Sequence, residues 1–151
     1  PFTALGNISF SLDDRDCLVI HATHFSQKEI VTNDIVNLLS PTEFFWCGRI
    51  DNVINTGGLK VFPEEIEPII GEVITNVRFF VTSQPSEKWG EELVLALEYT
   101  TMQDDEQKTG EIRPDFIEKL RLKLPSHAIP RKYIAVKHFK ETTTGKIIRE
   151  L

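Results

Sequence analysis

The chain has 151 residues, a formal net charge of −6, and 40% hydrophobic and 26% charged residues. This length suits one ordinary domain, or one small domain with an appendage, and the composition is close to the globular average. The acidic balance gives no electrostatic case for nonspecific nucleic-acid binding. No apolar run approaches the roughly 20 residues that a membrane-spanning helix needs.

The start of the chain and its two cysteines predict the cellular setting. Residues 1–5 lack the basic and apolar regions of a signal peptide, and a start at Pro1 instead of Met fits a fragment or a processed piece. Cys17 and Cys47 do not form a CxxC pattern. We therefore expect a reducing, cytoplasmic setting in which both thiols are buried, apolar and unreactive.

The first third of the chain predicts short β-strands. Residues 7–12 alternate polar and apolar side chains, and residues 17–21 read as the strand that returns after a polar turn, which predicts a hairpin. Another candidate strand covers residues 34–39 and is ended by Ser40-Pro41. A turn is expected at Gly48-Arg49.

The pattern changes after Asp51. Two short strands surround Thr56-Gly57-Gly58, which is a hairpin signal. Pro63 suits the first turn of a helix, and the two glutamates that follow complement the positive end of that helix. The remaining predicted elements are strands over 77–81, 93–97 and 133–136, a loop around Trp89, a surface loop over 100–110, and a second helix from Pro114 to Pro125.

This order of elements, ββαββαβ, predicts an α+β domain with a short β-sheet and packed helices. The strands before it form a separate small β unit. We place the boundary at residues 49–52, which divides the chain into 1–50 and 51–151.

Two motifs carry a resemblance to a known family. The first runs from Gly48 to Glu67 and reads GRIDNVINTGGLKVFPEEIE, and the second, at 142–151, reads TTTGKIIREL. In this order they resemble the C-terminal part of the acyl-adenylate-forming enzymes, which include acyl-CoA synthetases, luciferases and peptide synthetase adenylation domains. The resemblance implies that 51–151 is a mobile C-terminal lid domain. Residues 1–50 would be a β-hairpin remnant, the terminal β-subdomain of a larger N-terminal adenylating domain.

The resemblance implies three nucleotide contacts. Asp34 matches the aspartate of a Thr-Gly-Asp motif that binds the ribose hydroxyls of ATP or acyl-AMP, although Asn33 stands here in place of glycine. Asparagine tolerates positive φ better than most residues, so we expect a turn at this position. Arg49 would lie near the ribose and phosphate. Lys60 stands where many relatives have a phosphate-binding arginine, and lysine supplies a point charge instead of a fork. A turn aspartate and surface cations are the alternative interpretations.

Asp51, Gly57 and Gly58 would serve the movement of the lid. Asp51 matches the hinge residue of the family, about which the C-terminal domain turns between two orientations; the alternative is a capping aspartate. The two glycines would line the tunnel for the pantetheine arm of CoA, because glycine permits positive φ and close approach of a ligand. An ordinary tight hairpin is compatible with that role.

Lys146 is the main catalytic candidate. In the family, the lysine of this terminal motif bridges the substrate carboxylate and the α-phosphate during adenylation. A carboxylate that attacks a phosphate brings two anions together, and a positioned ammonium stabilises the charge of the transition state. The alternative is a solvated lysine in a tail. The glycine spacing of a Walker phosphate loop is absent from this motif.

The resemblance also implies cofactors, substrates and partners. The enzyme would be an AMP-forming acid–thiol ligase that uses ATP, CoA and Mg²⁺, bound mainly by an N-terminal domain outside this chain, so we expect the chain to be inactive alone. No histidine or cysteine cluster has metal-ligand spacing, and we predict no metal site. Residues 57–67 are similar to the o-succinylbenzoate–CoA ligases of menaquinone biosynthesis. Two alternatives stay open: an amino-acid-adenylating domain that loads a carrier protein, and a stand-alone, non-catalytic binding module.

Overall fold

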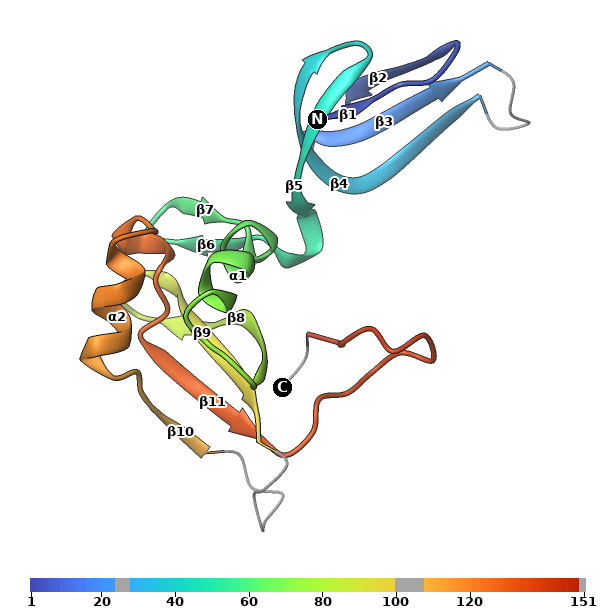
Figure 1. The fold of residues 1–151 in the computed structure, drawn as a ribbon. Helices are drawn as coiled ribbons and strands as arrows, with labels where there is room; N and C mark the ends of the chain where they lie inside the picture. The colour runs from blue at the N-terminus through green and yellow to red at the C-terminus, as the bar shows by residue number, and fades with distance from the viewer. Residues whose placement is uncertain (24–27, 100–107, 150–151) are drawn as a thin grey trace. The chain divides into compact units, whose positions relative to one another are not determined.

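The computed structural model describes residues 1–23, 28–99 and 108–149 and divides into two compact units, Pro1–Val53 and Ile54–Leu151 (Figure 1). The division falls just after the region, 49–52, where the sequence places a domain boundary. No helix in the described part of the chain is long and apolar enough to cross a membrane.

Unit 1 is a five-stranded antiparallel sheet in the order β1-β5-β4-β3-β2. The predicted hairpin is confirmed as β2 and β3, with Leu12 opposite Leu18. The structure extends this hairpin by three further strands. The elements are β1 (Phe2–Thr3), β2 (Ile8–Leu12), β3 (Cys17–Ala22), β4 (Glu29–Ser40) and β5 (Glu43–Arg49), followed by the short 3-10 helix η1 (Ile50–Asn52).

Two turns expected in unit 1 are wrong. Asn33 lies inside β4, and the non-glycine residues with positive φ in the described part of the chain are Asp16 and Asn76 alone. Gly48 and Arg49 are the last residues of β5, and the chain turns only afterwards, at η1. The physical reason is strand pairing: β4 and β5 form one long ladder, and its hydrogen bonds override the local turn preferences of these residues.

One hydrophobic cluster of unit 1 lies on one face of the sheet. Leu18, Val36 and Phe44 are buried there, and the edge of the Phe10 ring meets Phe44 with 4.9 Å between ring centroids. Cys17 is fully buried, and burial raises the pKa of its thiol, as expected for an unreactive residue. The same expectation is wrong for Cys47, which is only half-buried.

Unit 2 confirms the predicted α+β class. Its sheet is built around β9, which pairs with β8 and β6 in antiparallel and with β11 in parallel, while β10 pairs with β11. The elements are β6 (Ile54–Thr56), β7 (Leu59–Val61), α1 (Pro63–Gly71), β8 (Arg78–Ser86), β9 (Gly90–Glu98), β10 (Lys108–Glu111), α2 (Pro114–Arg121), the 3-10 helix η2 (Ser126–Ala128) and β11 (Lys132–Val136).

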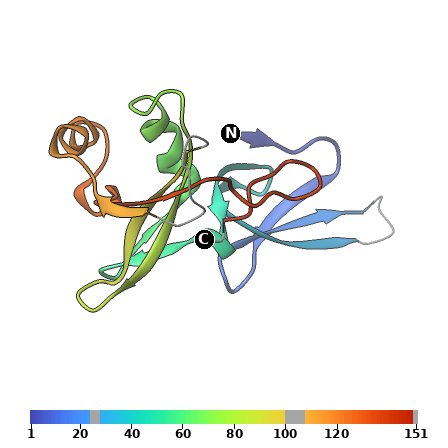
Figure 2. The same ribbon diagram turned by 90° about the horizontal axis from the view of Figure 1, so that it is seen from below.

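Both helices lie on the same side of this sheet (Figure 2). Successive residues of a strand point to opposite faces, so β8 and β9 serve both sides. Val81 and Leu95 pack against the helices, whereas Phe80 and Ala96 face the other side, where Phe139 covers them. The sheet is therefore buried on both faces near its centre.

Three expectations for unit 2 need correction. The loop around Trp89 is short, because β8 continues through Pro85, which pairs with Glu91; proline is tolerated there since β8 is an edge strand. The second helix ends at Arg121, before Pro125. The last part of the expected loop over 100–110 is strand β10, while residues 100–107 lie outside the described residues.

Candidate functional site

The structure brings together the three site residues that the sequence places in unit 1. Asp34 and Arg49 are directly opposite each other in the ladder between β4 and β5. Their charged groups approach to 3.8 Å between Asp34 Oδ1 and Arg49 Nη1, and Arg49 Nη2 donates to Asp51 Oδ2 at 2.9 Å. All three side chains are partly exposed, so the group is open to a ligand.

Asp34 is held through its side chain and through its backbone. Trp46 Nε1 donates to Asp34 Oδ1 at 3.2 Å, and the backbone N–H of Asp34 donates to Thr32 Oγ1 at 3.1 Å. Within the described residues, Oδ2 accepts no hydrogen bond. A fixed carboxylate with an open oxygen suits a hydroxyl-bearing ligand, because hydrogen bonds to an ionised acceptor are short and strong.

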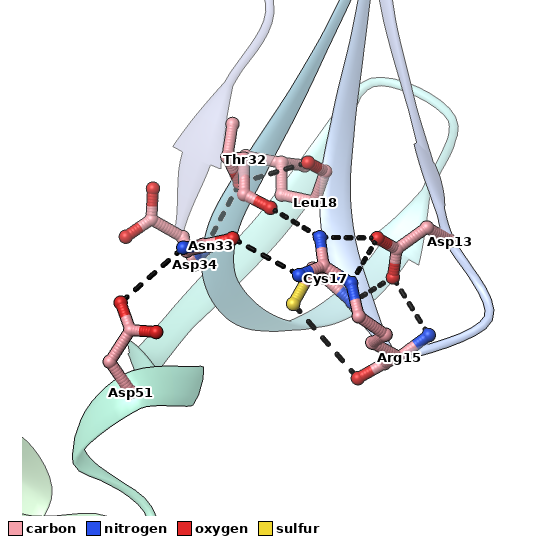
Figure 3. A network of polar contacts seen from close by, with 8 residues as sticks. All are labelled: Asp13, Arg15, Cys17, Leu18, Thr32, Asn33, Asp34 and Asp51. Carbon is pink, nitrogen blue, oxygen red and sulfur yellow. Dashed lines mark hydrogen bonds and ion pairs between the residues drawn. The ribbon is translucent and has the colours of Figure 1, made fainter.

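Asn33 is a contact that sequence reasoning missed. Its Nδ2 donates to Asp51 Oδ2 at 3.4 Å, and its Oδ1 accepts from Arg15 Nη1 at 3.2 Å (Figure 3). Arg15 is itself held by Asp13 through Nε and Nη2 at 2.9 and 2.8 Å. A chain of hydrogen-bonded side chains thus leads from the β2–β3 turn to Asp51. The one signal of this contact in the sequence was the asparagine in place of the expected glycine.

Asp13 also caps its own turn, and this affects its titration. Burial raises the pKa of the Asp13 carboxyl, but hydrogen bonds from the Cys17 N–H and from the Arg15 side chain and N–H lower it, and the net pKa lies below the ordinary value. The carboxylate form is therefore the one that the fold stabilises.

In unit 2, Gly57 and Gly58 form the predicted two-residue hairpin turn, which is confirmed. Thr56 pairs with Leu59 across the turn, and the two glycines have φ of 58° and 81°. Positive φ at both positions is the requirement of a type I′ turn, which glycine satisfies at no steric cost. Gly57 also lies against Trp89, since a Cβ on Gly57 would be 3.0 Å from the indole ring.

A pocket of about 300 Å³ opens beside this turn. Trp89, Leu59 and Leu93 supply its apolar side, and its polar side is supplied by Ser126, His127 and Arg131. Gly57 lines the pocket, whereas Gly58 and Lys60 do not. Lys60 lies exposed on β7, opposite Asn55. Sequence reasoning missed the polar side of this pocket. Residues 126–131 are distant from the Gly57-Gly58 turn in the sequence and meet it only in the folded domain.

Lys146 lies on a hairpin that we call the lysine hairpin, residues 140–148, drawn in red in Figure 1. Two backbone bonds close it: Ile148 N–H donates to the Lys140 carbonyl, and Thr142 N–H to the Lys146 carbonyl, each at 2.8 Å. Gly145 supplies the left-handed residue of its turn, with φ of 78°. The Lys146 side chain is exposed and makes no ion pair with any described residue.

The base of the lysine hairpin is fixed although its tip is exposed. Arg78 on β8 bridges two carboxylates, Glu98 at 2.9 Å and Glu141 at 2.5 Å, and Glu98 is almost fully buried. Ile147 packs on the cluster around Phe80. Sequence reasoning missed Arg78 and Glu98, whose only signal is that Arg78 interrupts one apolar run and Glu98 follows another.

No group of three His, Cys, Asp or Glu side chains within the described ranges is placed to hold a metal ion.

Comparison with known proteins defines the class. No protein-family profile matches the chain. The 2-succinylbenzoate–CoA ligase of Listeria monocytogenes is 32% identical over 120 residues, which are 78% of this chain and 24% of that protein. Surfactin synthase subunit 2 of Bacillus subtilis is 32% identical over 118 residues, 78% of this chain and 3% of that protein. The o-succinylbenzoate–CoA synthetase of Bacillus subtilis, solved with its acyl-adenylate intermediate, has the same fold, with a TM-score of 0.70 at 15% identity over 95% of this chain and 32% of that chain.

These likenesses agree with the two sequence motifs and with the α+β fold of unit 2. The chain belongs to the acyl-adenylate-forming superfamily and corresponds to the C-terminal part of its members. It spans about a quarter of the length of the ligases that it matches.

Proposed function

We propose that this chain is the terminal part of an ATP-dependent carboxylate–CoA ligase and that Lys146 is its adenylation lysine. The observation that carries the proposal is the lysine hairpin: an exposed ammonium, without an ion pair among the described residues, directly after the turn of a hairpin whose base is fixed. A lysine that only makes the surface soluble would not need a hairpin base that is held by ion pairs and apolar packing. The large adenylating domain would bind most of the ATP and the acid.

The first half-reaction joins the acid to AMP. A carboxylate oxygen attacks the α-phosphorus of ATP, the bond to the bridging oxygen breaks, and pyrophosphate leaves with the electron pair. The Lys146 ammonium would lie between the carboxylate and the α-phosphate, where it stabilises the charge on the phosphoryl oxygens and orients the attack. Mg²⁺ would be held mainly by the adenylating domain.

Unit 1 would contact the nucleotide in the same step. Asp34 Oδ2 is open to accept from a ribose hydroxyl, while Trp46 holds Oδ1. Arg49 would give up its longer contact with Asp34, at 3.8 Å, for a phosphate oxygen and keep its shorter bond to Asp51. Lys60 would be a third cation near phosphate in the alternate orientation of the lid.

The second half-reaction makes the thioester. The domain would turn about Asp51, so that the hairpin of Gly57 and Gly58 takes the place of the lysine hairpin. The CoA sulfur then attacks the acyl-AMP carbonyl, the bond to AMP breaks, AMP leaves, and the thiol proton passes to solvent. The pocket beside Gly57, with apolar Trp89 and Leu59 and polar Arg131, is consistent with a pantetheine arm that carries a phosphate at its end.

The acid that we propose is o-succinylbenzoate, on the strength of the motif at 57–67 and of the Listeria relative. A specific observation supports a second candidate, a domain that loads a carrier protein, because the match to the surfactin synthase subunit is equally strong in identity. The acid pocket would belong to the adenylating domain. The choice between the two candidates is therefore made by measuring which class of acid the complete protein activates.

The test compares the complete protein with the 151-residue chain. Each is given ATP and CoA with o-succinylbenzoate, a fatty acid or a set of amino acids, and pyrophosphate and thioester are followed. We expect the complete protein to turn over at about 1–10³ per second on o-succinylbenzoate, and the chain alone to make neither product. Pyrophosphate with amino acids only would favour the carrier-loading domain. Absence of both products from the complete protein with every acid would favour a non-catalytic binding module.

A further inference from the structure

We propose that Arg149 is a positioning residue, which holds the lysine hairpin through its ion pair with Glu67 so that Lys146 reaches the adenylation site. This inference rests on the proposed role of Lys146. The terminal motif contains two cations three positions apart. Lys146 is exposed, whereas most of the Arg149 side chain is buried.

The pair of Arg149 and Glu67 has the geometry of a fork. Arg149 Nη1 donates to Glu67 Oε1 at 2.5 Å, and Nη2 donates to Oε2 at 2.7 Å. The side chains are 26% and 19% exposed, respectively. Two parallel charge-assisted bonds fix both the distance and the plane of the guanidinium, which a single ammonium cannot do.

The ion pair of Arg149 and Glu67 also supplies hydrogen-bond partners to the backbone at an unpaired edge of the sheet. Strand β8 pairs with β9 alone, so one side of its backbone has no strand partner. The N–H of Val81 donates to Glu67 Oε1 at 2.7 Å, and Arg149 Nη1 donates to the Val81 carbonyl at 3.2 Å. The ion pair thus replaces a neighbouring strand at Val81, where buried backbone groups need partners.

The surroundings keep Arg149 charged and in place. Its guanidinium lies 5.8 Å from the centroid of the Phe80 ring. Burial lowers the pKa of Arg149, but the bonds to Glu67 raise it, and the net pKa is above the ordinary value. Three elements, α1, β8 and the segment after the lysine hairpin, therefore meet at one guanidinium.

This position controls Lys146 because little chain separates them. Only Ile147 and Ile148 intervene; Ile147 packs on the Phe80 cluster, and the Ile148 N–H closes the hairpin at Lys140. A second ion pair, Arg78 with Glu141, holds the opposite strand of the hairpin. Its side chains are more exposed than those of Arg149 and Glu67. Loss of Arg149 would release the strand that carries Lys146 and leave the ammonium charged but misplaced.

The experiment uses the complete ligase and separates the half-reactions. Arg149→Gln is compared with wild type in ATP–pyrophosphate exchange and in thioester formation from preformed acyl-AMP. We expect adenylation to fall by about 10²-fold, the cost of a misplacement near 1 Å, and thioester formation to stay near wild type. Arg149→Lys, which restores one charge-assisted bond of the fork, should recover part of the loss. The matched control is Lys132→Gln, which breaks another partly buried ion pair of unit 2, with Glu92, away from the hairpin.

A double mutant shows whether Arg149 acts through Lys146. If it does, adding Arg149→Gln to Lys146→Ala should cause little further loss of adenylation, because the group that it positions is gone. Fully additive losses would overturn the inference. Equal loss of both half-reactions in Arg149→Gln, matched by the Lys132→Gln control, would also overturn it, since that is the result of general destabilisation.

The two proposals fail in different ways. If Lys146→Ala leaves adenylation intact, the proposed function of Lys146 is wrong. If Lys146→Ala abolishes adenylation while Arg149→Gln leaves it unchanged, only the role of Arg149 is wrong. A readout without activity is available in the 151-residue chain: hydrogen exchange of the Lys146 amide should speed up in Arg149→Gln and stay unchanged in Lys132→Gln.

Discussion

The charged residues of unit 1 and those of the lysine hairpin are organised in opposite ways. In unit 1, Asp34, Arg49 and Asp51 contact one another, so each candidate ligand-binding group already has a partner. At the lysine hairpin, Arg78 of β8 pairs with Glu141, and Arg149, directly after the hairpin, pairs with Glu67, while the Lys146 side chain is exposed.

The difference suits two roles, ligand binding in unit 1 and transition-state stabilisation at the lysine hairpin. A group that binds the nucleotide can exchange a partly exposed ion pair for a ligand at little cost, because such pairs contribute only about 0–1 kcal/mol. A group that stabilises a transition state must arrive without a competing partner and at a fixed place, since preorganisation is what makes it effective.

The largest effect is expected for Lys146→Ala in the complete ligase. Acyl-AMP formation should fall by at least about 10²–10³-fold, the value of one preorganised donor, because the substitution removes the ammonium that would stabilise the phosphoryl oxygens. Thioester formation from preformed acyl-AMP should be near normal. Both rates are measured with the same preparation. A similar loss in both steps would assign the hairpin a structural role.

Gly58→Asn should show the reverse pattern. Asparagine accepts the left-handed φ of 81°, and no atom of the described residues lies within 4 Å of an added Cβ, so the turn should persist. A side chain that narrows the CoA path should slow thioester formation by about 10²-fold, with pyrophosphate release unchanged. Gly6→Asn is the matched control, because Gly6 has φ of 64° and equally open surroundings. Unchanged thioester formation in Gly58→Asn would remove Gly58 from the tunnel.

Asp51→Pro tests the hinge between the two units. Proline fixes φ, so the variant should keep one half-reaction and slow the other by about tenfold, which corresponds to about 1.4 kcal/mol. Asp51→Ala is the control, since it removes the carboxylate bound by Arg49 and Asn33 but leaves φ free. If proline and alanine slow both half-reactions alike, the carboxylate matters and the hinge does not.

The smallest effect is on the acid stability of unit 1. The folded pKa of Asp13 lies below its ordinary value of 3.8, so its stabilisation is present above that pH and is lost as the pH falls through the folded pKa. Asp13→Asn should therefore lower the unfolding temperature at pH 7 and have little effect well below pH 3.8. Asp14→Asn, a neighbour without the bonds to Arg15, controls for net charge. A loss of equal size at both pH values would contradict the assignment.

Local patterns fixed much of this fold in advance. The alternation over 7–12, the glycine pair at 57–58 and the proline with two glutamates at 63–65 each predicted their element, because each depends on neighbours within a few residues. The two motifs predicted the superfamily for the same reason. The predicted turns at Asn33 and Gly48 failed because their conformation is set by a partner strand that is distant in the sequence.

The α+β class, the family and the terminal lysine motif could therefore be predicted from local patterns. Which charges meet depends on the fold of the whole chain. Glu67 and Arg149 are 82 positions apart, and Arg78 and Glu141 are 63 apart, so no spacing rule connects them. Ion pairs of this kind depend on the register of β8 and on the path of the lysine hairpin, which follow from packing of the whole sheet. That packing determines where the terminal lysine is held.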